Sequence, residues 1–69
     1  MERLVVNSSN LASVGYDAAT QTLEIEFNHG GVYQYYNVDE SVYTDLISAG
    51  SIGSYFSHNI RDVYTTQKV

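Results

Sequence analysis

The chain has 69 residues and a formal net charge of −5, with only three Lys and Arg residues, no cysteine and two histidines. This length predicts one domain over residues 1–69 with a core over about residues 5–64, and this composition predicts no disulfide, no metal site and no cofactor. Three cations are too few for the ~6–10 phosphate contacts that proteins bound to duplex DNA typically make. We find no apolar run long enough to span a membrane and no secretory signal, so we expect a cytoplasmic protein that does not bind membranes.

The first half of the chain is predicted to form strands. Residues 5–6 predict a short edge strand, and the alternation of larger apolar with small or polar residues over 12–16 predicts a second strand. A turn at residues 17–21 separates it from the clearest strand, residues 22–27, in which three apolar residues alternate with two glutamates. That alternation predicts one buried and one solvated face.

A hairpin is predicted next. The run Asn-His-Gly-Gly at residues 28–31 suits a tight turn, because glycine tolerates the positive φ that such a turn needs. The following residues, 32–38, are rich in aromatic and β-branched side chains and predict the returning strand.

The second half of the chain is predicted to be helical. Asp39 is suited to cap the N-terminus of a first helix, and Gly50 is suited to end it. Ser51 is suited to cap a second helix, in which apolar residues recur at spacings near three and four as far as Tyr64. Residues 65–69 are expected to fray. The chain is therefore predicted to be an α+β domain, with a small antiparallel sheet of three to four strands followed by two α-helices packed on one face.

An ordered set of short motifs resembles a known family. The motifs are Ser8-Ser9, Val14-Gly15-Tyr16-Asp17, Thr22-Leu23, Val32-Tyr33-Gln34-Tyr35, Val42-Tyr43 with Leu46, and Ser51-Ile52-Gly53-Ser54-Tyr55-Phe56 with Ile60. Together they resemble the KTSC domain, which is named for its occurrence at the C-terminus of some lysyl-tRNA synthetases. Its hallmark Tyr-x-Tyr is matched by Tyr33 and Tyr35. The resemblance covers about residues 5–64. It implies a small α+β domain without an established biochemical role, for which RNA binding is suggested by the association with synthetases.

The first candidate binding residues are Tyr33 and Tyr35, which lie on one face of a predicted strand. Two rings on one face could stack on the bases of single-stranded RNA or on a peptide. The alternative is that both rings pack in the core with their hydroxyl groups at its edge. Alternation favours packing, because the opposite face of the same strand carries the polar Gln34.

Two further pairs are candidates. His58 and Arg61 are predicted on the polar face of the second helix, where they could contact a phosphate or an acidic partner, although a solvated helix face is the commoner reading. Glu24 and Glu26 point to the same side of their strand. Paired carboxylates can serve acid–base chemistry, but this pattern is more typical of an exposed strand face.

The predicted function is a non-catalytic binding module rather than an enzyme, because no nucleophile–base pair can be identified. The acidic charge favours a protein partner with a basic surface, and an extreme form of this hypothesis is a phage-type inhibitor that imitates nucleic acid. Single-stranded RNA is the alternative that the family resemblance implies. Nothing in the sequence determines the oligomeric state.

Overall fold

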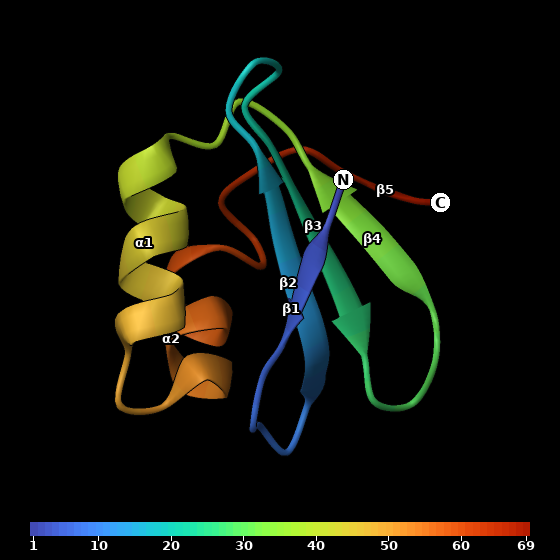
Figure 1. Cartoon of the computed structure of the whole chain (residues 1–69), viewed down its shortest axis with the longest axis vertical. Coiled ribbons are helices and arrows are strands. Elements are labelled where there is room, and N and C mark those ends of the chain that lie inside the picture. Colours follow the sequence, from blue (N-terminus) through green and yellow to red (C-terminus); the bar gives the residue numbers. More distant parts are fainter.

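The computed structural model describes residues 1–69 as an α+β domain in which two helices pack against one face of an antiparallel sheet (Figure 1). The elements are β1 (Arg3–Val5), β2 (Leu11–Asp17), β3 (Thr22–Phe27), β4 (Val32–Tyr35), α1 (Glu40–Ser48), α2 (Ile52–Asn59) and β5 (Thr66–Lys68). The strands lie in the sheet in chain order, β1-β2-β3-β4-β5. The predicted fold class is therefore confirmed, with five strands rather than the expected three to four.

The predicted hairpin between β3 and β4 is present. Gly30 has a φ of 101° and Gly31 a φ of 90°, a region of backbone conformation in which a side chain would be strained. The backbone N–H of Phe27 donates to the carbonyl of Gly31 at 3.1 Å and closes the turn. The resulting register places Ile25 opposite Tyr33.

A β-bulge near the start of β2 alters the predicted alternation. The register between β2 and β3 shifts between Leu11 and Ser13, which leaves Ala12 as an extra residue without a partner on β3. Leu11 and Val14 are both buried, whereas Ala12 is only partly buried. The predicted alternation therefore holds from Val14 onward and fails at Ala12.

The C-terminal residues form β5, so the prediction of a frayed tail is wrong. The backbone N–H of Val69 donates to the carbonyl of Val32 at 2.8 Å, and the Thr66 hydroxyl donates to the carbonyl of Gln34 at 2.9 Å. All three residues of β5 are exposed, so no apolar periodicity marks this strand in the sequence. It forms because the edge of β4 carries backbone groups that need hydrogen-bonding partners.

The second helix is shorter than predicted. It begins after the predicted N-cap Ser51 but ends at Asn59, several residues earlier than expected. The N–H groups of Ile60 and Arg61 both donate to the carbonyl of Phe56 at 3.0 Å, and the second of these bonds closes a wider turn that ends the helix. Ile60 is fully buried, and the residues after it cross to the edge of β4 to form β5.

The core lies between the sheet and the two helices. Its buried members are Leu11, Val14, Leu23, Ile25, Tyr35, Val38, Leu46, Phe56 and Ile60. The rings of Tyr35 and Phe56 meet edge to face with their centroids 5.6 Å apart, so β4 and α2 are joined at the centre of the core. Neither helix has the length and apolar character required to cross a membrane.

Tyr16 joins β2 to α1. Its ring stacks on that of Tyr43, with centroids 5.3 Å apart and planes inclined by 13°, and its hydroxyl donates to the carbonyl of Val38 just before the helix. The helix begins at the predicted N-cap Asp39, whose carboxylate accepts the N–H of Glu40. Burial raises the pKa of Tyr16 above its ordinary value of 10.0, and nearby carboxylates, Glu40 and Asp39 among them, raise it further.

We expect Tyr35→Ala to lower the free energy of unfolding by about 3–5 kcal/mol, the range for loss of a large buried ring, since only 3 % of Tyr35 is exposed. Tyr33→Ala should cost clearly less, because Tyr33 is only partly buried. Urea unfolding followed by circular dichroism measures both losses. Tyr33→Phe and Tyr35→Phe are the matched controls that keep each ring. Equal losses in the two alanine variants would contradict this difference in burial.

We also expect stability to fall at alkaline pH. Because the pKa of Tyr16 is raised in the folded chain, its contribution is complete below the ordinary value of 10.0 and is lost as pH rises through the folded-state pKa. Burial raises the pKa values of Tyr35 and Tyr55 in the same direction. Urea unfolding from pH 8 to pH 11 should show a decline above about pH 10 that is smaller in Tyr16→Phe. Parallel curves for that variant and the wild type would exclude Tyr16 as a contributor.

Candidate functional site

The face of the sheet opposite the helices carries a row of aligned residues, one from each strand. In the strand register Arg3 lies opposite Gly15, Gly15 opposite Glu24, Glu24 opposite Gln34, and Gln34 opposite Gln67. We call these five residues the polar row. The alternation along each strand turns them away from the core, which predicts solvated side chains.

Hydrogen bonds connect the side chains of the polar row. One oxygen of Glu24 lies 2.8 Å from Nη1 of Arg3, and the other accepts the amide of Gln34 at 2.9 Å. The Tyr36 hydroxyl donates to the amide oxygen of Gln34 at 3.1 Å and lies 3.5 Å from that of Gln67. The Glu24 side chain is only 14 % exposed as a result. The expectation of a freely exposed Glu24 is therefore wrong, because both of its oxygens bind other strands.

Gly15 makes the ion pair of the polar row possible. A Cβ atom at this position would lie 2.6 Å from the carbonyl oxygen of Glu2 and 2.9 Å from Cγ of Arg3, both closer than real Cβ atoms approach. Only glycine lets β1 lie this close to β2, and the Arg3 side chain then extends across β2 to Glu24 on β3.

Glu26 has a separate partner. The hydroxyl of Ser13 donates to its carboxylate at 2.9 Å, and Ser13 is itself 5 % exposed. Glu26 is partly buried rather than freely exposed, so the expectation of an exposed strand face also fails here. Glu24 and Glu26 each join neighbouring strands through different partners, an arrangement that stabilises the sheet.

The two candidate tyrosines lie on the helix-covered face of β4. Tyr35 is buried against Phe56, and burial is the largest cause of its raised pKa. Tyr33 is partly buried and meets the ring of Phe27 edge to face, with centroids 5.5 Å apart. Tyr35 therefore has no open ring face for a base, and core packing is the correct reading for this residue.

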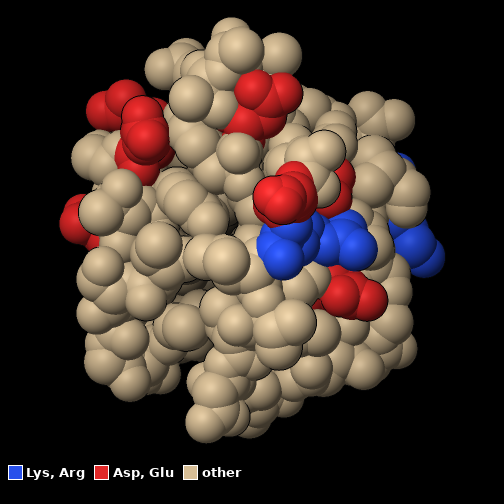
Figure 2. Space-filling view, in the orientation of Figure 1, with Lys and Arg blue, Asp and Glu red and all other residues tan.

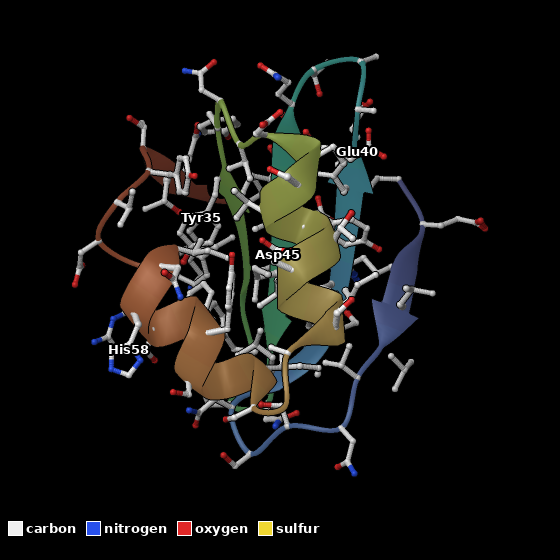
Figure 3. All side chains as sticks on the ribbon, turned by 90° about the vertical axis from the view of Figure 1, so that its left-hand side faces the viewer. Tyr35, Glu40, Asp45 and His58 are labelled. Carbon is white, nitrogen blue, oxygen red and sulfur yellow. The ribbon has the colours of Figure 1, made fainter.

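His58 and Arg61 do not share a helical face, contrary to the prediction. His58 lies on α2 with Nδ1 2.9 Å from the carbonyl oxygen of Ser54, and its side chain points away from the sheet (Figure 3). Arg61 follows the end of α2, and its Nε lies 3.8 Å from the carboxylate of Asp62. Both residues are exposed. No group of three or more His, Asp or Glu side chains is placed to hold a metal ion, and the surface has no pocket.

A concentration of acidic residues around α1 was not identified from the sequence. We call it the acidic α1 surface, and it consists of Asp17, Asp39, Glu40 and Asp45. Asp17, Asp39 and Glu40 all contribute to the raised pKa of Tyr16, so these three carboxylates lie near its ring, whereas Asp45, further along α1, contributes to the raised pKa of Tyr55. Figure 2 shows acidic atoms near the start of α1 and the β2–β3 turn with no basic atoms beside them, and other acidic atoms next to the basic atoms over β1.

Two of these four residues make no hydrogen bond or ion pair through their carboxylates. Asp17 accepts the N–H of Ala19 within the β2–β3 turn, and Asp39 caps α1. Glu40 and Asp45 are exposed on α1, and neither carboxylate takes part in a hydrogen bond or an ion pair (Figure 3). The spacing of Asp39, Glu40 and Asp45 was available from the sequence, but the approach of Asp17 depends on how β2 packs beside α1.

Comparison with known proteins identifies the same family along most of the chain. The KTSC domain family matches residues 7–64. A crystal structure of a KTSC domain protein from Yersinia pestis superposes with a TM-score of 0.96 and 37 % sequence identity, covering 99 % of this chain and 96 % of that chain. An uncharacterized protein from Stutzerimonas stutzeri is 42 % identical over 57 residues, which are 83 % of this chain and 80 % of the relative.

Other relatives are much longer proteins. A lysine–tRNA ligase from Nostoc punctiforme is 38 % identical over 61 residues, and the match spans 88 % of this chain but only 11 % of the ligase. A ligase from Trichormus variabilis is 37 % identical over 54 residues, again across 10 % of its length. The shared segment is thus this small domain, alone in some proteins and a minor part of others. From its fold, its motifs and these relatives, the chain belongs to the KTSC domain family.

Proposed function

We propose that this KTSC domain is a non-catalytic binding module of the cytoplasm, and that a protein partner with a basic surface docks on the acidic α1 surface. The observation that carries this proposal is the pair of exposed carboxylates on α1, Glu40 and Asp45, which no cation neutralises. Exposed charges that are not neutralised by a neighbouring cation can steer and orient a partner.

The distribution of the cations supports this choice of surface. Arg3 is paired with Glu24 on the sheet, Arg61 lies beside Asp62, and Lys68 belongs to β5. None of them lies on α1, so the negative potential of the acidic α1 surface has no compensating charge on the same helix. A basic partner would be attracted there, whereas a polyanion would be repelled.

RNA is the alternative that the lysine–tRNA ligase relatives raise. Two features of the surface weigh against it. The ring of Tyr35 is buried and offers no stacking surface, and Arg61 has an acidic neighbour in Asp62. With a net charge of −5, sequence-independent phosphate contacts would gain little.

We expect the double substitution Glu40→Gln with Asp45→Asn to reduce binding of the partner about tenfold, the equivalent of about 1.4 kcal/mol. Both side chains keep their size, and the N-cap Asp39 is untouched, so the fold should be unchanged. Affinity capture from a native lysate, read by quantitative mass spectrometry of protein and sequencing of RNA, measures the loss. Nuclease-treated and untreated arms distinguish the two ligand classes.

The matched control is Glu2→Gln with Asp62→Asn, which removes the same charge from exposed positions away from α1. A partner that both double variants retain equally would contradict docking on the acidic α1 surface. Recovery of RNA that nuclease removes, together with every captured protein, would favour the RNA alternative instead.

A further inference from the structure

β1 is attached to the rest of the domain by one strand and one ion pair. Its three residues are exposed, none belongs to the core, and it pairs only with β2. Val5 is 89 % exposed. One ion pair, between Arg3 and Glu24, connects this strand to β3. In Figure 1 β1 lies in front of β2, and no strand pairs with its outer edge.

Next to β1, the sheet combines a glycine on β2 with a carboxylate on β3, an arrangement that accommodates an arginine side chain. Because Gly15 has no side chain, the surface of β2 is open at this position. Glu24, on the next strand, directs one carboxylate oxygen toward this open position. Gln34 holds the other oxygen of Glu24 at 2.9 Å and so fixes the carboxylate in place. In Figure 2 the basic atoms over β1 lie between acidic atoms, as this pairing requires. We call Gly15, Glu24 and the edge of β2 that pairs with β1 the arginine slot.

We propose that the arginine slot is a binding site for an extended segment of a partner protein that carries an arginine followed by aliphatic residues, and that β1 occupies it in the free protein as an intramolecular substitute. The partner segment would add to β2 as an antiparallel strand, with backbone hydrogen bonds giving affinity and the arginine giving register. β1 itself shows the pattern, because Arg3 is followed by Leu4 and Val5.

The chemistry of the arginine slot favours this occupant over others. With β1 in place, the Glu24 side chain is 14 % exposed and lies beyond Gly15, where the long Arg3 side chain crosses β2 to reach it. Arginine has the planar donors for such a contact, and lysine has a single rotating charge. The slot lies on the sheet and shares no residue with the acidic α1 surface, so this inference does not depend on the function proposed above.

The test uses the full chain with β1 prevented from pairing. Arg3→Ala with Leu4→Pro removes the ion pair and a backbone donor, and both side chains are outside the core. The probe is a fluorescent peptide with the sequence of residues 1–7, added to this variant and to the wild type. We expect the variant to bind the peptide at least about tenfold more tightly than the wild type does, as measured by fluorescence anisotropy.

Three controls make the site specific. Adding Glu24→Gln to the β1 variant, or replacing the peptide arginine by lysine, should weaken binding, whereas adding Glu40→Gln with Asp45→Asn should leave it unchanged. Peptide affinity that is unchanged by Glu24→Gln or by replacement of the peptide arginine would overturn the proposal. Absence of peptide binding to the β1 variant would overturn it as well. If the wild type formed a dimer and Arg3→Ala were a monomer, the occupant of the slot would be a second copy of this chain, and the proposal of a different partner protein would be overturned.

Hydrogen exchange keeps the proposal testable should the double variant fail to fold. In Arg3→Ala alone, the amides of Leu4 and Val6 should exchange faster than in the wild type, while those of Leu23 and Ile25 keep their protection. The N–H of Val6 is bonded to the carbonyl of Ala12 in the intact strand. Unchanged exchange at Leu4 and Val6 would show that β1 does not leave the slot, and would overturn its role as a displaceable substitute.

Discussion

The alternation along β3 is the constraint on which the rest of the structure depends. This central strand turns Leu23 and Ile25 toward the helices, where both are fully buried, and turns Glu24 and Glu26 to the other side. A shift of one residue in its register would place carboxylates in the core and leucine in water, so the register is strongly determined. The helices, the core and the polar row all follow from this one strand.

Much of this fold follows from local sequence rules, and the exceptions have a physical cause. The hairpin at Gly30 and the caps at Asp39 and Ser51 were predictable because each depends on a conformation or a hydrogen bond within a few residues. β5 was not, because it depends on the edge of β4, which is distant in sequence. The same holds for the candidate sites. The pairing of Arg3 with Glu24 spans two strand registers, and no spacing in the sequence indicates it.

The domain therefore carries two unlike surfaces on opposite sides of one thin core. The acidic α1 surface is uncompensated and polar, and its carboxylates are free of structural partners at Glu40 and Asp45. The polar row is fully paired, and its charges hold strands together. The two surfaces are thus separate within one small domain, and relatives of this domain occur both as small proteins and as a minor part of lysine–tRNA ligases.

The order of the strands has a consequence for how the chain folds. Because β1 to β4 lie in the sheet in chain order, each pairs with its neighbour through a short connection, and those hairpins require little loop-closure entropy. β5 is different, since two helices separate it from β4, its only partner strand. We therefore expect β1 to β4 to reach their register as a four-stranded meander before the chain returns, with the pairing of β5 as the last step of folding.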